Sequence, residues 1–271
     1  MKQYIVDAFT EELFAGNPAA VLPCLSMPSS DLMLKIAIEN NYSETAFVVR
    51  RRKGDYDLKW FTPGGEVELC GHATLATSFV LSHFVDPGVE EMHFHTLSGE
   101  LIVRADAAGS YTMDFPVGEY KPIPLSETIK AATGGLALEA YYDGEGGDMI
   151  VLVPSEEALA GFVPDFELMK RVEGRGIVLT ALSQEYDFVS RCFYPKLDVP
   201  EDPVTGSAHT YLTPLWAERL GRIFPDGSSS EMRARQVSRR GGVLKVRLAA
   251  GRVYITGSAC LFMFGEIPFD L

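Results

Sequence analysis

The sequence predicts an α+β fold of two similar domains, each a β-sheet wrapped around a central buried helix. Two observations indicate this fold. Segments typical of strands recur in the same order in the two halves of the 271-residue chain. In each half, one of these strands leads through a turn into a segment that begins with glycine and other small residues and continues as a run rich in apolar side chains. We therefore expect two equivalent halves.

The first recurring element is an aromatic strand of alternating pattern that ends at a proline. It reads DYDLKWFTP at 55–63 and EYDFVSRCFYP at 185–195. The helix expected after it starts with GHA at 71–73 in the first half and with GSA at 206–208 in the second. The two starts lie about half the chain apart, as a duplication requires.

The second recurring element is a β-hairpin. GELIVRADAAGSYTMDF at 99–115 and GGVLKVRLAAGRVYITG at 241–257 both read as strand, Ala-Ala-Gly turn and strand. Hairpins can look alike by chance, but the common order and the nearly equal spacing of the two pairs favour duplication.

The expected helices differ in how clearly the sequence marks them. Residues 29–40 start with serine and carry one apolar face, and a strand, TAFVVR, follows. Residues 71–85 are apolar nearly all round, which is typical of a helix buried on every side. Residues 206–221 form the corresponding helix of the second half, although Pro214 should kink or break it.

The domain boundary is expected in the proline-rich segment PVGEYKPIP at 116–124, which we interpret as a linker. The first domain then spans residues 1–117, joined by the last strand at about residues 260–271. The second spans residues 118–259.

Composition and charge exclude several function classes. With 46% hydrophobic and 11% aromatic residues, the chain can bury a large core. Its 24 basic and 37 acidic residues give a net charge of −13, which argues against nucleic-acid binding but permits a small anionic ligand. Neither a signal peptide nor a membrane span is recognisable, and the four cysteines are scattered, so we expect reduced thiols and a cytoplasmic protein.

No cofactor and no metal are expected. The chain has neither a phosphate-binding P-loop nor a GxGxxG segment after a strand. His93 and His95 share one face of an expected strand and could hold a metal, but no further cluster of ligands lies nearby in the sequence.

The two expected helix starts suggest an anion site. The first N–H groups of a helix are unpaired and carry a partial positive charge, and Gly71 and Gly206 would let a ligand approach the backbone. His72 and Ser207 add side-chain donors, and Asp202 lies in the loop before the second helix. Ordinary helix capping is the alternative interpretation of these polar residues.

Several segments together resemble the PhzF-like family (phenazine biosynthesis-like proteins) of the diaminopimelate epimerase fold superfamily. The resemblance extends over nearly the whole chain. The matching segments, specific as a set in this order rather than singly, are DAFTEELFAGNPAAVLP at 7–23, NYSETAFVV at 41–49, WFTPGGEVELCGHATLA at 60–76 and EDPVTGSAHTYLTPLWAERLG at 201–221.

The resemblance implies two domains related by pseudo-twofold symmetry, with a cofactor-independent isomerase site in the cleft between them. Such an enzyme moves a proton within a small carboxylate-bearing substrate. By motif match, Glu44 of SETAF carries over as general acid/base, together with His72, Asp202 and Ser207.

The backbone at Gly71–His72 and at Gly206–Ser207 would hold the substrate carboxylate. Asn17 either contacts the ligand or serves a turn. The resemblance is also compatible with a homodimer.

Two other functions stay open. Relatives in this superfamily include racemases and epimerases with two opposed cysteines, and Cys70 stands where one such thiol would lie. The repeat aligns Cys70 with Thr205, so a racemase would lack its second thiol, whereas a lyase would need only one. A carboxylate-binding protein without catalysis is the third interpretation. In the same alignment Glu44 falls opposite Gly174–Arg175, so the acid is not duplicated.

Overall fold

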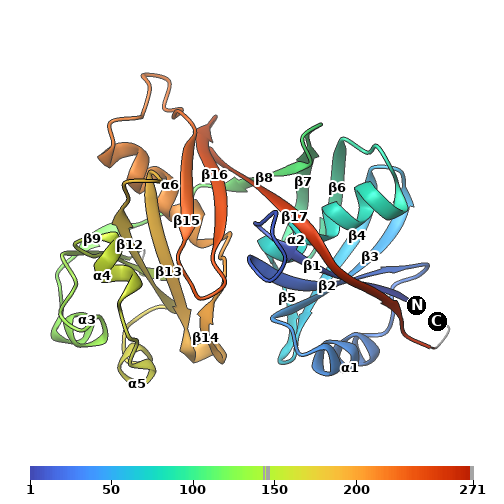
Figure 1. Cartoon of the computed structure of the whole chain (residues 1–271), viewed down its shortest axis with the longest axis horizontal. Coiled ribbons are helices and arrows are strands. Elements are labelled where there is room, and N and C mark those ends of the chain that lie inside the picture. The colour runs from blue at the N-terminus through green and yellow to red at the C-terminus, as the bar shows by residue number, and fades with distance from the viewer. Residues whose placement is uncertain (143, 145–146, 269–271) are drawn as a thin grey trace. The chain divides into compact units, whose positions relative to one another are not determined.

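The computed structural model describes residues 1–142, 144 and 147–268, which form two compact units (Figure 1). Unit 1 comprises Met1–Phe115 and the C-terminal residues from Tyr254 onward, and unit 2 comprises Pro116–Val253. The last strand of the chain thus belongs mostly to unit 1, far in sequence from the strands that it joins. None of the helices in the described part combines the length and the apolar character that a membrane span requires.

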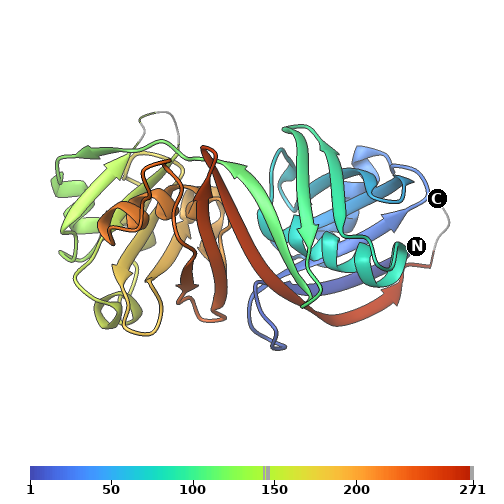
Figure 2. The ribbon, with the colours of Figure 1, turned by 90° about the horizontal axis from the view of Figure 1, so that it is seen from above.

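Unit 1 is a mixed sheet of parallel and antiparallel strands whose pairings form a closed ring. β1 pairs with β2 and β17, the order continues through β3, β4, β6, β7 and β8, and β8 pairs with β17. Figure 2 shows β8 beside β17. The strands are β1 (Lys2–Ala8), β2 (Asn17–Cys24), β3 (Glu44–Arg52), β4 (Asp55–Thr62), β5 (Gly65–Val67), β6 (Glu91–Thr96), β7 (Gly99–Ala105), β8 (Ser110–Pro116) and β17 (Arg252–Glu266).

Helix α2 (Gly71–Val80) packs against β1, β2, β3 and β7 of this ring, and a π-helical turn, η1 (Leu81–Val85), continues it. Residues 72–78 are buried without interruption, as expected for a helix without a polar face. The expectation was wrong at the far end, where Phe84 is 45% exposed. Phe84 lies in η1, and its ring stacks on that of Tyr4.

The outer face of the unit 1 sheet is covered by α1 (Ser30–Asn40). Its start follows from the sequence, because the Ser29 hydroxyl accepts a hydrogen bond from the backbone N–H of Leu32. At its end Asn41 adopts the left-handed conformation and turns the chain into β3. Met33 and Ile36 of α1 pack on Phe47 and other buried residues of the sheet.

Unit 2 repeats the succession of strand pairings found in unit 1. A parallel pair (β11–β12) is followed by an antiparallel pair (β12–β13), a parallel pair (β13–β15) and an antiparallel pair (β15–β16), as for β2–β3, β3–β4, β4–β6 and β6–β7. The strands are β9 (Lys121–Ile123), β10 (Glu139–Tyr142), β11 (Asp148–Leu152), β12 (Gly176–Leu182), β13 (Phe188–Tyr194), β14 (Val199–Asp202), β15 (Met232–Gln236) and β16 (Gly242–Ala249).

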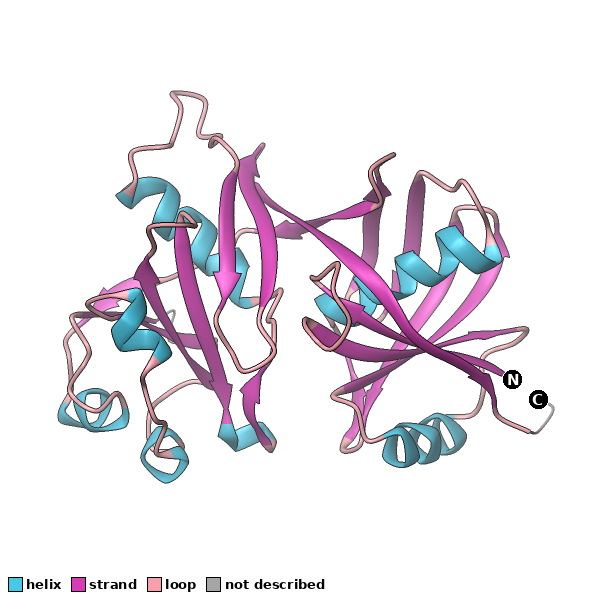
Figure 3. Cartoon of the chain, in the orientation of Figure 1, coloured by secondary structure: helices cyan, strands magenta, loops and turns pink. Residues whose placement is uncertain are grey.

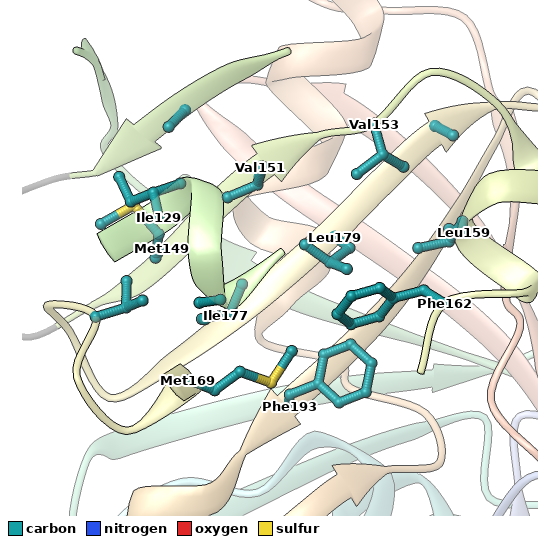
Figure 4. Packing of buried hydrophobic residues seen from close by; sticks show 14 of the residues in the cluster. Ile129, Met149, Val151, Val153, Leu159, Phe162, Met169, Ile177, Leu179 and Phe193 are labelled. Atoms are coloured by element: carbon teal, nitrogen blue, oxygen red, sulfur yellow. The ribbon is translucent and has the colours of Figure 1, made fainter. Parts of the chain in front are cut away.

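Helices cover two faces of the unit 2 sheet (Figure 3). Because side chains alternate along a strand, Leu179 of β12 faces one cluster while its neighbour Thr180 accepts a hydrogen bond from Trp216 on the other side. The Leu179 cluster includes Phe162, Phe193 and Met169 (Figure 4). The helices are α3 (Glu127–Ala132), α4 (Glu156–Ala160), α5 (Phe166–Met169), the 3-10 turn η2 (Pro195–Leu197) and α6 (Ala208–Arg219).

Pro214 does not break the second apolar helix, contrary to the expectation from sequence. α6 runs through it from Ala208 to Arg219. Pro214 cannot donate a hydrogen bond to the carbonyl of Thr210, but the backbone N–H of Gly118 donates to that carbonyl at 3.2 Å. The freed acceptor is therefore satisfied from a neighbouring segment.

The segment interpreted as a linker is partly a strand. Within residues 116–124, Lys121–Ile123 form β9 and pair with β10. Pro122 lies within β9 opposite Tyr141 and does not prevent this pairing.

Core packing in unit 2 can be tested at β12. Leu179→Ala removes a fully buried side chain and should lower the free energy of unfolding by about 2–5 kcal/mol. Leu182→Ala on the same strand is the matched control, because Leu182 is 56% exposed and its loss should change stability by less than about 0.5 kcal/mol. Urea denaturation measures both, and equal losses in the two variants would contradict the assigned register.

Candidate active site

In unit 1, three polar side chains meet at the start of α2. The imidazole of His72, 6% exposed, lies between Asn17 and Glu44. Asn17 Nδ2 is 3.2 Å from His72 Nδ1, and Glu44 Oε2 is 3.1 Å from His72 Nε2. The predicted residues Glu44, His72 and Asn17 are thus brought together, next to Gly71.

Strand topology explains this meeting. β2 and β3 are parallel and both begin at the same edge of the sheet, with Ala19 opposite Glu44 in the register. Asn17 and Glu44 are the first residues of these strands, so their side chains reach the edge where α2 starts. Gly16, at φ +67°, supplies the turn before β2, since a Cβ there would lie 2.3 Å from the carbonyl oxygen of Ala8.

The contact between Glu44 and His72 is close but is not aligned as a hydrogen bond. Neither Glu44 Oε2 nor His72 Nε2 has a hydrogen-bond partner among the described residues, although both atoms are buried. Buried polar atoms without partners are costly and uncommon in folded proteins. Here the two atoms face each other at 3.1 Å.

Electrostatics favours a charged imidazole in this pair. Desolvation opposes the imidazolium, but the neighbouring Cys70 and the carboxylate of Glu44 outweigh it, so the pKa of His72 lies well above its usual value. Burial, followed by the charge of Glu44, raises the pKa of the Cys70 thiol. The interaction with Glu44 therefore favours protonation of His72, whereas burial favours the uncharged thiol of Cys70.

Glu44, Cys70 and His72 also offer three potential metal ligands within 4.8 Å of one another. However, Cys70 Sγ lies 3.5 Å from Nδ1 of His72, whereas Glu44 contacts Nε2. The lone pairs of the two ring nitrogens diverge, so one ion bound to the imidazole would not reach both other ligands. The three side chains surround the ring rather than a common point, and the absence of a metal stays a prediction.

His93 and His95 lie on β6 as expected, each beside carboxylates. His93 contacts Glu91 at 3.0 Å and Glu100 at 3.1 Å, and His95 contacts Asp55 at 2.6 Å. These imidazoles therefore contact carboxylates at the sheet surface, where such contacts contribute little to stability.

In unit 2, the predicted residues gather at the start of α6. Ser207 is the N-cap residue, but its side chain makes no capping hydrogen bond, and the same holds for Cys70 before α2. Asp202 ends β14 rather than lying in a loop, because it pairs with Cys192 of β13. Its carboxylate accepts a hydrogen bond from Thr205, and Gln236 donates to its carbonyl.

Sequence reasoning assigned no role to Arg175, whose Nη2 donates to the Ser207 hydroxyl oxygen at 2.9 Å. The guanidinium also binds Asp148. Desolvation lowers the pKa of Arg175, but its hydrogen bonds and the charge of Asp148 outweigh this and hold the pKa above its usual value. The one available signal was the repeat, which places Glu44 opposite Gly174–Arg175.

A second buried histidine, His209, is the second residue of α6. His209 is fully buried, and its Nδ1–H donates to the carbonyl of Thr205 at 2.8 Å. Its Nε2 has no hydrogen-bond partner among the described residues. Burial, only partly opposed by the Thr205 carbonyl, lowers the pKa of His209 to about 4.

Comparison with known proteins places these residues in a family context. A family model described as "Phenazine biosynthesis-like protein" matches residues 6–265. An uncharacterized isomerase of Pseudomonas aeruginosa is 45% identical over 262 residues, covering 97% of this chain and 96% of its own. The crystal structure of a PhzF-family phenazine biosynthesis protein from Enterococcus faecalis superposes with a TM-score of 0.92 at 43% identity, over 99% of both chains.

Two further structures extend the likeness. A putative phenazine biosynthesis PhzC/PhzF protein from Clostridium difficile gives a TM-score of 0.90 at 42% identity, covering 99% of this chain and 100% of its own. A probable proline racemase from Agrobacterium radiobacter gives a TM-score of 0.61 at 12% identity, covering 99% and 93% of the respective chains, which shows a shared fold alone.

The buried His209 should make stability depend on pH. Its folded-state pKa of about 4 lies below the usual 6.5, so the unfolded chain takes up this proton first as the pH falls. The contribution to stability is complete above pH 6.5 and is lost toward pH 4, by about 3 kcal/mol. Urea denaturation across this range should show a flatter profile for His209→Gln than for the wild type. His83→Gln, at an exposed histidine, should follow the wild type, and parallel profiles for all three proteins would contradict the assignment.

Proposed function

The chain belongs to the phenazine biosynthesis-like (PhzC-PhzF) family of isomerases, and on this premise we propose that it moves a proton within a small carboxylate-bearing substrate without a cofactor. The mixed-sheet, epimerase-like fold that it shares with a probable proline racemase is compatible with such chemistry. Fold alone does not define a reaction, so the proposal depends on the side chains at the start of α2.

The observation that supports it most is the buried pair of Glu44 and His72. A carboxylate can accept a proton from carbon, and an adjacent imidazole N–H can stabilise the negative charge that develops on the substrate. The two functional atoms lie 3.1 Å apart and lack other hydrogen-bond partners among the described residues. Both are therefore available to a substrate at the same place.

The proposed reaction uses Glu44 twice. Its carboxylate takes a proton from one carbon, which breaks the C–H bond and leaves the electron pair delocalised toward a conjugated group of the substrate. The resulting carboxylic acid then returns the proton to another carbon, so the double bond shifts and the composition of the substrate is unchanged. His72 stabilises the intermediate charge, while Asn17 fixes the orientation of the imidazole at 3.2 Å.

The proposal assigns substrate binding to Gly71, Gly206 and Ser207, with Asp202 orienting a polar group of the substrate. It includes pseudo-twofold symmetry of two domains whose helix starts serve one substrate in a cleft. The repeated succession of strand pairings in the two units supports duplication. A cytoplasmic location, a homodimer and the absence of nucleic-acid and membrane partners are also parts of the proposal.

A second candidate is a racemase, epimerase or lyase that uses Cys70, whose Sγ lies 3.5 Å from His72 Nδ1. Two observations weaken it. The thiol is buried and its pKa is raised, which reduces the reactive thiolate. The repeat also places Thr205, not a second cysteine, opposite Cys70. A carboxylate-binding protein without catalysis is the remaining alternative, and it would show binding without solvent exchange.

Glu44→Gln should abolish proton transfer but leave binding nearly intact. Cyclic carboxylates and amino-dicarboxylates would first be screened for thermal stabilisation, and the hits followed for deuterium incorporation from heavy water. We expect the exchange rate to fall by about 10²–10⁴-fold in the variant, because the acid/base is lost while the shape of the site is kept. Glu66→Gln, at an exposed glutamate of the same unit, is the control. Exchange close to the wild-type rate in Glu44→Gln would refute the assignment.

Cys70→Ala distinguishes the two candidate chemistries. If Glu44 is the acid/base, this variant should keep deuterium exchange within about tenfold of the wild type, since the thiol then carries no proton to or from the substrate. A loss as large as that of Glu44→Gln would instead support thiol chemistry. Thermal denaturation of Cys70→Ala checks that the variant is folded.

A further inference from the structure

We propose that Arg175 is a positioning residue of this site, which holds the Ser207 hydroxyl as a hydrogen-bond donor for the substrate carboxylate and presents a positive charge beside it. The inference rests on the proposed function, because that function assigns carboxylate binding to Ser207. It adds a residue that acts through Ser207.

Arg175 stands in unit 2 where Glu44 stands in unit 1. Glu44 begins β3, the second strand of the parallel pair β2–β3, and Arg175 directly precedes β12, the second strand of the parallel pair β11–β12. Each side chain reaches the start of the following apolar helix, where Glu44 lies by His72 and Arg175 by Ser207. The equivalent positions thus carry an acid in one unit and a permanent cation in the other.

The guanidinium is held rigidly. Its Nε and Nη2 donate to the two oxygens of Asp148 at 2.8 Å and 3.2 Å, and the Tyr194 hydroxyl donates to Asp148 at 3.0 Å. The Tyr194 ring lies 5.4 Å from the guanidinium carbon. Gly176 makes room for that ring, because a Cβ at this position would be 2.2 Å from it. A planar group fixed in this way loses little entropy when it binds a further partner.

The direction of the hydrogen bond determines what Ser207 can do. Arginine can only donate, so Ser207 Oγ is the acceptor of the bond from Nη2. The hydroxyl proton of Ser207 is then directed toward another acceptor. The Ser207 oxygen accepts no capping bond from the N–H groups of α6, so the bond from Arg175 is not in competition with a helix cap. A carboxylate oxygen is the acceptor that such a hydroxyl would bind most strongly.

The two charges of the Arg175–Asp148 pair differ in their exposure to solvent. The Asp148 side chain is fully buried, whereas 40% of the Arg175 side chain is exposed. An anion at Ser207 therefore meets the positive end of the pair, within a protein whose net charge of −13 otherwise repels anions. The alternative is that Arg175 only neutralises Asp148 and anchors β12 to the start of α6.

Binding of benzoate and of benzamide, its neutral isostere, separates the two roles. Ligand-observed NMR titration should show that the wild type prefers benzoate, and that Arg175→Gln and Ser207→Ala each reduce this preference by about tenfold. Adding Arg175→Gln to Ser207→Ala should reduce the preference for benzoate little further, because Arg175 acts through Ser207. Arg175→Lys should restore part of the preference. Arg171→Gln removes an equal charge at an exposed site and should leave the preference unchanged.

Loss of Arg175 leaves Asp148 buried without its cation, so the Arg175→Gln/Asp148→Asn double variant is the substitute if the single variant does not fold. The inference would be overturned if the Arg175 variants preferred benzoate over benzamide as strongly as the wild type does. It would also be overturned if neither the wild type nor the variants preferred benzoate. Additive effects of Arg175→Gln and Ser207→Ala would also overturn it. Benzoate binding does not require Glu44, so this outcome is independent of the Glu44→Gln result that tests the proposed function.

Discussion

The constraint on which unit 1 depends is the burial of a helix that has no polar face. α2 can be stable in water only if strands enclose it, and the ring of pairings that ends with β8 beside β17 provides the enclosure. The N-terminus of such a helix must lie at an edge of the sheet, where backbone and side-chain donors can be used. The parallel strands β2 and β3 begin at that edge, so Asn17 and Glu44 necessarily lie by His72.

The two units share an order of strand pairings but carry opposite charges at an equivalent position. Their sheets repeat the same succession of parallel and antiparallel pairs, yet the equivalent positions hold Glu44 in one and Arg175 in the other. In the proposed function, the duplicated frame supplies two helix starts that bind the substrate, and a single unduplicated acid moves the proton. This division of labour suits a reaction in which one proton leaves the substrate and returns to it, because only one group has to carry the proton.

The polar groups at these helix starts lower stability relative to an apolar core. Glu44 Oε2 and His72 Nε2 are buried without hydrogen-bond partners among the described residues, and Asp148 is completely buried beneath its arginine. Such arrangements cost free energy that packing elsewhere must offset, and they are characteristic of functional sites rather than of structural cores. The surrounding clusters, with Phe47 in unit 1 and Leu179 in unit 2, contribute the compensating burial of apolar surface.

The sequence by itself determined the elements and the family. Periodicity and capping residues located α1, α2 and the hairpins, because these depend on neighbouring residues, and the repeat indicated duplication. The motifs SETAF and CGHA supplied Glu44 and His72. Only the tertiary structure decided the contacts between segments distant in sequence. Gly118 satisfies the carbonyl that Pro214 leaves free, β9 forms within an apparent linker, and Arg175 reaches Ser207 across 32 positions. These contacts depend on strand order and register, which no local pattern encodes.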